Sequence, residues 1–189
     1  IQTPGEGIRS RQRGQMRPDA DCRLCGLCEG RTNIVLPDGD VLSGIVFVGE
    51  APGENEDLEG RPFVGRSGKI LDGMMQDAGI SRSEVLITNT VKCRPPGNRD
   101  PTPDEMHACR AFLESEIVGA KLVIGLGKSA CRDLMGFDGK MSEIVNRITT
   151  IRVGEVDVRF LPTYHPAATI YNKVSREELR RTMAIVREE

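Results

Sequence analysis

The chain has 189 residues, of which 38% are hydrophobic and 29% charged, a composition typical of globular proteins that excludes a disordered or fibrous one. The formal net charge is only −2, so any contact with nucleic acid must come from a local basic patch. No apolar run approaches about 20 residues and no apolar leader is found at the start, so we expect a cytoplasmic protein that makes no membrane contact.

Residues 1–18 predict a flexible basic tail, because they hold four arginines, one glutamate and no apolar periodicity. A basic arm that contacts nucleic acid is the alternative interpretation. Residues 19–189 are predicted to form a single domain. Short apolar runs in it predict buried strands over 45–48, 85–88 and 122–124, and the alternating segment 148–162 predicts a hairpin whose second arm, 156–161, reaches the core.

Helical spacing predicts helices that alternate with these strands and end the chain. They cover residues 67–78, a segment that begins at Thr102, residues 128–135 and residues 176–187. The segment Thr102-Pro103-Asp104-Glu105 has the composition of a capping box with proline in the first turn. The alternation predicts an α/β fold, a three-layer α/β/α sandwich with a central, mostly parallel, four-stranded sheet.

Four residues lie just beyond the carboxyl ends of predicted strands: Glu50, Asn89, Gly127 and His165. Because function gathers at the carboxyl ends of strands in such folds, we expect them to lie at one edge of the sheet. Together with Phe63, they bring a carboxylate, an aromatic ring, an amide and an imidazole to that edge. This set suits a pocket that stacks a planar ring, reads its edge and stabilises charge at a reacting bond.

The six cysteines, in a chain without a secretory signal, indicate metal ligation or buried thiols and not a disulfide framework. Cys22 and Cys25 form a CxxC pair that Cys28 extends, and Cys93 and Cys109 form a second pair. Two pairs suit a set of four thiolates, which zinc and a [4Fe–4S] cluster both accept. Local spacing therefore does not name the metal.

Two further features exclude simpler motifs, and a third concerns the remaining cysteine. Ferredoxin spacing requires a fourth cysteine near position 32, which is Thr32. The segment GLGKS at 125–129 lacks the first glycine of a P-loop, because that position is Leu122. Cys131 lies in a predicted helix beside apolar positions and is expected to be a buried free thiol.

The segments GEAPGENED at 49–57, GRPFVG at 60–65, TNTVKCRPP at 88–96 and YHPA at 164–167 resemble the iron–sulfur (family 4) uracil-DNA glycosylases, with both cysteine pairs in place. The resemblance runs from about Cys22 to the C-terminal helix. It implies a monofunctional DNA repair enzyme of base excision repair, which flips uracil out of DNA and hydrolyses its N-glycosidic bond, leaving an abasic site. The implied partner is uracil-containing DNA, single- or double-stranded, bound by a nucleoid-associated monomer. A contact with a sliding clamp is not readable from the sequence.

The resemblance also implies that Cys22, Cys25, Cys93 and Cys109 hold a [4Fe–4S] cluster with a structural role, zinc being the alternative. The cluster would brace the proline-rich loop 94–103 beside the DNA. Cys28 lies outside the family's ligand pattern, and we treat it as a spare thiol.

The same resemblance implies a role for each pocket residue. Phe63 stacks on the flipped ring, and the Asn89 side chain accepts a hydrogen bond from N3–H and donates one to O4. His165 donates to O2 as negative charge builds on the departing uracil. Glu50 orients the attacking water or stabilises an oxocarbenium-like sugar, and Glu56 excludes the methyl group of thymine.

The remaining implied contacts concern the substrate backbone and the gap that the flipped base leaves. Gly49 belongs to the substrate-binding set, and Arg94 and Arg99 are candidate contacts to DNA. Relatives carry paired bulky aliphatics and an arginine after the His-Pro segment, whereas this chain has Ile170 alone and no arginine there. We therefore expect weaker base extrusion and a preference for mismatched or single-stranded uracil.

Two alternatives remain at this point: a glycosylase with broader base choice, such as hypoxanthine, and a non-catalytic iron–sulfur module that binds damaged DNA. The presence of Glu50, Asn89 and His165 together argues against the module. The short path from Thr90 to Pro103 holds no inserted basic, histidine-bearing loop, which argues against the related branch that becomes trapped on abasic DNA.

Overall fold

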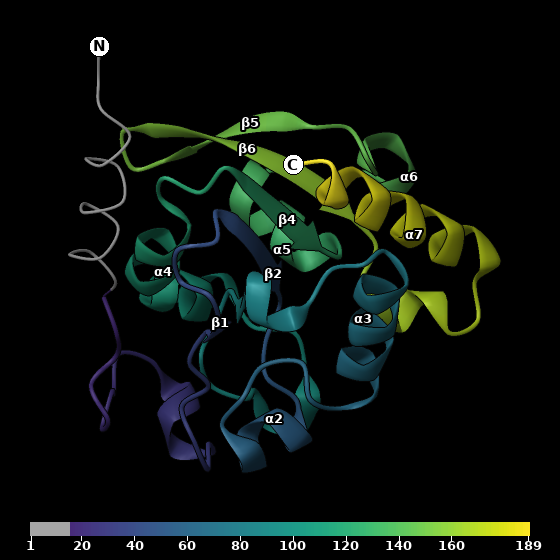
Figure 1. The fold of residues 1–189 in the computed structure, drawn as a ribbon. Coiled ribbons are helices and arrows are strands. Elements are labelled where there is room, and N and C mark those ends of the chain that lie inside the picture. Colours follow the sequence, from purple (N-terminus) through teal and green to yellow (C-terminus); the bar gives the residue numbers. More distant parts are fainter. Residues whose placement is uncertain (1–15) are drawn as a thin grey trace.

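Six strands form one sheet in the order β1-β3-β2-β4-β6-β5, in a computed structural model that describes residues 16–189 (Figure 1). The strands are β1 (Asp38–Gly39), β2 (Ile45–Gly49), β3 (Leu86–Asn89), β4 (Leu122–Leu126), β5 (Thr149–Val153) and β6 (Val156–Thr163). The four central strands run parallel, and β1 and β5 pair antiparallel at the two edges. The predicted α/β class is confirmed, but the prediction of four strands is wrong by the two edge strands.

The two edge strands carry weak sequence signals. β1 has only two residues, too few to show an alternating pattern, and it pairs with Leu86 and Ile87 of β3. β5 is the first arm of the predicted hairpin and pairs with β6 from Thr149 to Val153. The central strands are far more apolar, and every residue of β4 is buried. Parallel strands are covered on both faces, which requires such continuous apolar runs.

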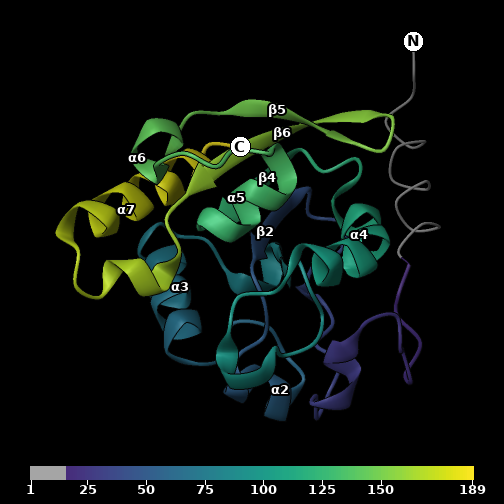
Figure 2. The same ribbon diagram turned by 180° about the vertical axis from the view of Figure 1, so that it is seen from behind.

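Helices cover both faces of the sheet (Figures 1 and 2). Helices α3 (Arg66–Asp77) and α7 (Lys173–Arg187) pack on one face, where Leu71 and Met183 meet Phe47 of β2. Helices α4 (Pro103–Ile117) and α5 (Lys128–Met135) pack on the other face, where Leu113 and Ala130 share a second core. The remaining helical segments are short. They are η1 (Gly26–Glu29), α2 (Glu54–Glu59), η2 (Arg82–Glu84), η3 (Pro96–Asn98), α6 (Met141–Ile144) and η4 (Pro166–Thr169).

The capping box predicted at the start of α4 is confirmed. The Thr102 hydroxyl accepts a hydrogen bond from the Glu105 main-chain nitrogen at 3.2 Å, and the Glu105 carboxylate accepts one from Thr102 N–H at 2.8 Å. Two of the main-chain donors at this helix end are therefore satisfied. The cap matters for the site because it fixes where the preceding proline-rich loop ends.

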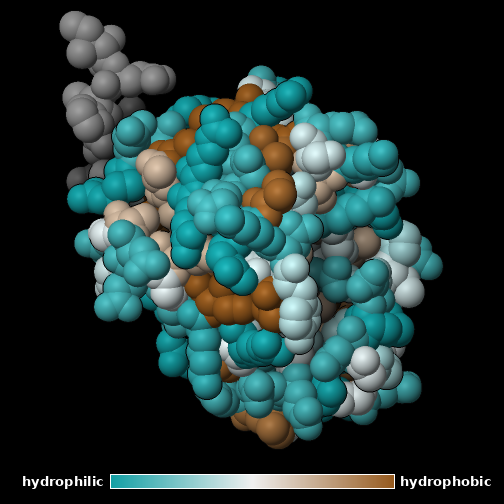
Figure 3. Space-filling view, turned by 90° about the vertical axis from the view of Figure 1, so that its right-hand side faces the viewer, coloured by the Kyte–Doolittle hydropathy of each residue, from teal (hydrophilic) through white to brown (hydrophobic). Residues whose placement is uncertain are grey.

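Crossovers through the helices return the chain to the amino edge of the sheet before each parallel strand, so these strands all end at the same edge. The loops that follow β2, β3, β4 and β6 therefore gather at the carboxyl edge. The segment after β2 runs down to α2, and the segment after β6 lies beside α3 (Figure 1). The face that carries α3 and α7 is largely hydrophilic, with small hydrophobic areas between polar side chains (Figure 3). Across residues 16–189, no helix has the length and apolar character needed to cross a bilayer.

Most of the predicted basic tail, residues 1–15, lies outside the described part of the chain. The described part begins at Met16, whose main-chain nitrogen donates to the Ser115 hydroxyl on α4 at 2.9 Å.

Candidate active site

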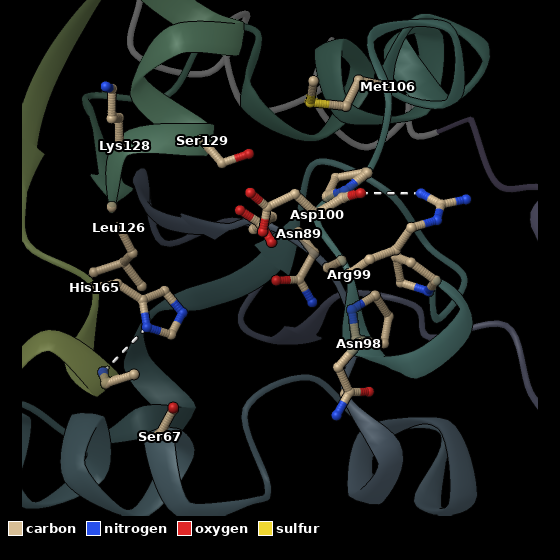
Figure 4. Close-up of a pocket in the computed structure, with 18 of the residues that line it drawn as sticks. Ser67, Asn89, Asn98, Arg99, Asp100, Met106, Leu126, Lys128, Ser129 and His165 are labelled. Atoms are coloured by element: carbon tan, nitrogen blue, oxygen red, sulfur yellow. Dashed lines mark hydrogen bonds between the residues drawn. The ribbon is translucent and has the colours of Figure 1, made fainter. Parts of the chain in front are cut away.

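A pocket of about 560 Å³ opens at the carboxyl edge of the sheet (Figure 4). Its lining brings together most of the side chains singled out from the sequence: Glu50, Glu56, Phe63, Asn89, Arg99 and His165. Three of them come from the segment between β2 and α3, Asn89 ends β3, and Arg99 and His165 lie on the loops after β3 and β6. The sheet edge is what makes these segments neighbours. Gly49 lies behind this set, whereas Arg94 and Ile170 are outside the lining.

Phe63 and Asn89 are seated against Gly49. A Cβ atom added at Gly49 would lie 2.4 Å from Phe63 Cζ and 2.6 Å from Asn89 Oδ1, so only glycine leaves room for both side chains. Phe63 has a φ of 51°, in the left-handed region that a bulky residue rarely adopts. Arg82 Nη1 donates to the Phe63 carbonyl at 2.8 Å and helps to hold this conformation. Strained backbone of this kind occurs where a side chain must be aimed.

His165 is a neutral imidazole held in one tautomer. It is the N-cap of η4, and its Nδ1 accepts a hydrogen bond from Ala167 N–H at 3.1 Å. Desolvation by burial lowers the pKa of His165 to about 4. Because Nδ1 is an acceptor, the single proton of the neutral ring is on Nε2, which lies on the side of the ring toward Asn89 in Figure 4. The site therefore holds a neutral N–H donor.

The His165 ring is fixed by two close neighbours. Its centroid is 5.8 Å from that of Phe63, with an angle of 32° between the rings. Gly127, which follows β4, has a φ of 92°, and a Cβ atom there would lie 2.9 Å from His165 Cβ. Gly127 thus lets the β6 loop approach the start of α5 closely.

Glu50 is half-buried at the end of β2 and lies near a second carboxylate. Burial raises the pKa of Glu50, and the hydrogen bond and negative charge of Asp100 raise it further, while a hydrogen bond from Ser129 opposes the shift. Asp100 and Ser129 line the same pocket. Neither was singled out from the sequence. Asp100 lies in the proline-rich loop 50 residues from Glu50, and no local pattern indicates that contact.

Glu56, on α2, lies over two glycines at the pocket wall. Cβ atoms added at Gly53 and Gly65 would each lie 3.5 Å from a Glu56 carboxylate oxygen. The carboxylate is therefore close to main chain on both sides and lines the pocket from α2.

The candidate DNA-contact arginines are engaged within the protein. Arg99 lines the pocket and forms a bidentate ion pair with Glu105, at 2.9 and 2.6 Å. Arg94 Nε donates to Asn98 Oδ1 at 2.7 Å across the η3 turn. Both arginines stiffen the loop 94–103.

Ile170 is half-buried, whereas its neighbour Tyr171 is 91% exposed and carries the largest exposed hydrophobic surface of this loop. Arg176, from the first turns of α7, donates to the carbonyls of Thr169 at 3.1 Å and Ile170 at 3.3 Å. An arginine from the following helix thus braces the loop in which the sequence lacks one.

Four cysteines pack in one hydrophobic cluster. Cys93 and Cys109 are buried with Leu27, Val91, Met106 and Phe112, and Cys22 and Cys25 pack against them from the segment before η1. Arg31 Nη1 donates to Cys93 Sγ at 3.6 Å and to the Cys22 carbonyl at 2.6 Å. Burial raises the pKa of Cys93 to about 11.

The other two cysteines lie elsewhere. Cys28 is half-buried and outside this packing cluster. Cys131 is buried in the core under α5, where its thiol donates to the Gly125 carbonyl at 3.7 Å. Within residues 16–189, no three histidine, cysteine or carboxylate side chains converge closely enough to hold a single metal ion.

Comparisons with known proteins place the chain in a family. The profile described as "Uracil DNA glycosylase superfamily" matches residues 36–186. The "Type-4 uracil-DNA glycosylase" of Sulfurisphaera tokodaii is 43% identical over 177 residues, which cover 88% of this chain and 79% of the relative. The protein of that name from Thermotoga maritima is 43% identical over 85% of this chain and 82% of its own length. The one from Archaeoglobus fulgidus is 40% identical, with 86% and 85% covered.

The first prediction concerns the His165 proton. We expect the ring to stay neutral from about pH 8 to about pH 5, with the proton on Nε2, because burial lowers its pKa to about 4. The unfolded chain takes up this proton near pH 6.5, so the folded state loses stability as the pH falls from about 6.5 toward 4. Proton–nitrogen correlation NMR of the imidazoles measures both, with His165→Gln to assign the signals and exposed His107 as the second histidine of the spectrum. Titration near pH 6.5 or a proton on Nδ1 would contradict the assignment.

Proposed function

The chain belongs to the uracil DNA glycosylase superfamily, and we propose that it removes uracil from DNA by hydrolysing the N-glycosidic bond, as the type-4 name of its relatives indicates. The observation that carries the proposal is a single pocket in which a neutral imidazole donor, a carboxamide, an aromatic ring and a carboxylate face one another. We further propose that residues 19–189 act as one domain and one monomer in this reaction.

Base recognition rests on Phe63 and Asn89. The pocket volume of about 560 Å³ suits one nucleotide, which must leave the DNA stack to enter. The uracil ring stacks on Phe63, and the Asn89 carboxamide accepts from N3–H and donates to O4. Cytosine presents the reverse pattern of donor and acceptor, so it would leave buried polar groups mispaired. Glu56 closes the side on which thymine carries its methyl group.

Bond cleavage rests on His165 and Glu50. When the bond between C1′ and N1 breaks, the electron pair stays on uracil, and its charge is shared with O2. The Nε2–H of His165 donates to O2 and stabilises that charge without giving up its proton. Water then forms the new bond to C1′. Glu50, held beside Asp100 and Ser129, orients this water and takes its proton, because a carboxylate with a raised pKa is a stronger base.

We propose Tyr171 as the residue that fills the gap left by the flipped base, in place of Ile170. Tyr171 is exposed at the loop that follows His165 and η4, and Arg176 fixes the main chain before it. An aromatic side chain stacks on any base, so it can replace the pair of aliphatics found in relatives. Arg94 and Arg99 remain candidates for phosphate contacts on the adjacent loop.

We propose that Cys22, Cys25, Cys93 and Cys109 hold a [4Fe–4S] cluster. Four free thiols in one apolar cluster fit this group, and Arg31 N–H is a suitable donor to a ligand sulfur. Zinc is the alternative occupant, because it also accepts four thiolates. When bound, the cluster supplies structural cross-linking and no step of the hydrolysis.

The second prediction tests the function itself. Purified protein is incubated with a uracil-containing oligonucleotide, and alkali converts abasic sites to strand breaks. We expect breaks only after alkali, and His165→Ala and Asn89→Ala to lower kcat about 10²–10³-fold, since each removes hydrogen bonds made to the departing base. His107→Ala, which removes an exposed histidine on α4, is the matched control.

Other outcomes of that assay separate the alternatives. If the protein binds uracil-containing DNA but produces no breaks in any substrate, the enzymatic function is refuted and the damage-binding module is favoured. Release of hypoxanthine at a similar rate would establish the broader specificity. Undiminished breaks in the His165 or Asn89 variants would refute the site assignment.

The third prediction concerns the cluster. Alanine variants of Cys22, Cys25, Cys93 and Cys109 are each expected to lose the broad visible absorbance of the protein and its bound iron, because each removes one ligand. The matched control is Cys131→Ala, and Cys28→Ala is expected to behave like it. Bleaching by Cys28→Ala, or a colourless protein that contains zinc, would contradict the ligand set.

The fourth prediction concerns Tyr171. We expect Tyr171→Ala to slow cleavage of duplex uracil on the order of tenfold and to leave single-stranded uracil almost unaffected, because stacking of one base is worth about 1–3 kcal/mol. Ile170→Ala is the matched comparison, with a smaller expected effect. A selective duplex defect in Ile170→Ala alone would reverse the assignment. Equal wild-type rates on U·A, U·G and single strands would refute the preference for easily extruded uracil.

A further inference from the structure

A buried lysine lies directly behind Asn89, and the reaction described above does not use it. Lys92 is 1% exposed and follows the end of β3 by three residues. Its ammonium donates to Thr88 Oγ1 at 2.7 Å, to the main-chain carbonyl of Asn89 at 2.7 Å and to Glu116 Oε2 at 2.8 Å. An ammonium group has three protons, so each one has its own acceptor.

The countercharge comes from a different layer of the fold. Glu116 is 3% exposed near the end of α4, and its Oε2 also accepts from the Thr88 hydroxyl at 2.8 Å. Lys92, Thr88 and Glu116 therefore form a closed network that joins the end of the sheet to α4. In a dry interior such a network has one good arrangement, because moving either charge leaves the other unpaired.

This network determines where the main chain of Asn89 lies. β1 pairs only with Leu86–Ile87 of β3, so its pairing ends before Asn89, and the Asn89 carbonyl is bonded by the ammonium. On the side of β2, Thr90 N–H donates to the Gly49 carbonyl at 3.0 Å and the Thr90 hydroxyl donates to the Glu50 carbonyl at 2.6 Å. The main chain that carries the Asn89 carboxamide is thus held from both sides.

Lys92 also reaches the cysteine cluster through its own main chain. Its N–H donates to the Cys109 thiol, and its carbonyl accepts from Val35 N–H at 2.8 Å. One residue thus contacts both the Asn89 main chain and one of the four clustered thiols.

We propose that Lys92, with Glu116 as its counter-ion, is a positioning residue that holds the Asn89 carboxamide in place against the bound base. Lys92 acts through the Asn89 main chain and does not touch the substrate. The rate of uracil release tests the inference only if the proposed function is correct. Hydrogen exchange of the same main chain is a second readout, which is independent of that function.

The test uses the variant Lys92→Met/Glu116→Leu, which replaces both charges with apolar side chains and leaves neither unpaired. We expect it to keep the circular dichroism of the wild type and to cleave uracil about 10–100-fold more slowly in single turnover, because small displacements of a positioning group are costly. We also expect Asn89→Ala to cost much less in this background than in the wild type, since a misplaced carboxamide contributes little. Lys121→Met, at the opposite, amino end of β4, is the matched control with a wild-type rate.

Three results would overturn the inference. They are a wild-type rate in the folded double variant, an Asn89→Ala penalty that is equal in both backgrounds, and amide exchange at Thr90 and Val91 that is no faster than in the wild type.

If the double variant does not fold, Thr88→Val decides, because it removes one acceptor of the ammonium and no charge. We expect a few-fold slower cleavage, restored by Thr88→Ser, and a wild-type rate in Thr88→Val would refute the role. If the wild type releases no uracil, only the proposed function is refuted. Amide exchange at Thr90 and Val91 would still test whether Lys92 holds the Asn89 main chain.

Discussion

This edge of the sheet depends on the hydrogen bonds of one buried ammonium group, that of Lys92, which is almost completely removed from water. Lys92 is tolerable there only because Thr88, Asn89 and Glu116 supply one acceptor for each proton. Loss of one partner of such a pair generally costs about 3–5 kcal/mol, because an uncompensated charge stays buried. The acceptors come from β3 and α4, so the network fixes the strand that carries the Asn89 carboxamide relative to the helix that carries Cys109.

Burial tunes two titratable groups of the pocket in opposite directions. Desolvation disfavours the charged form of each group, so it lowers the pKa of His165 and raises the pKa of Glu50. The first effect leaves a neutral N–H donor in the pocket, and the second leaves a more basic carboxylate. Desolvation thus shifts the pKa of both groups. The Asp100 carboxylate adds to the upward shift of the Glu50 pKa alone.

Close approach of main chain sets the shape of the pocket. The Phe63 ring and the Asn89 amide occupy the space that a side chain at position 49 would fill. His165 likewise occupies the space that a side chain at position 127 would fill. Phe63 keeps its positive φ because Arg82 and the surrounding loop hold its carbonyl. The strained residue lines the pocket, and its side chain packs in the same core as the buried side chains of α3.

The sequence by itself determined the α/β layers, the four parallel strands, the α4 cap and the group of Glu50, Asn89, Gly127 and His165 at one edge of the sheet. These follow from local periodicity, local turn chemistry and the rule that parallel strands share a carboxyl edge. Only the tertiary structure placed Asp100 beside Glu50, Arg176 under the η4 loop and Glu116 against Lys92. Only it added β1 and showed that β1 and β5 complete a six-stranded sheet. Those contacts join residues far apart in the chain, and they depend on where the connections between strands place each helix and loop against the sheet. No pattern within either segment carries that information.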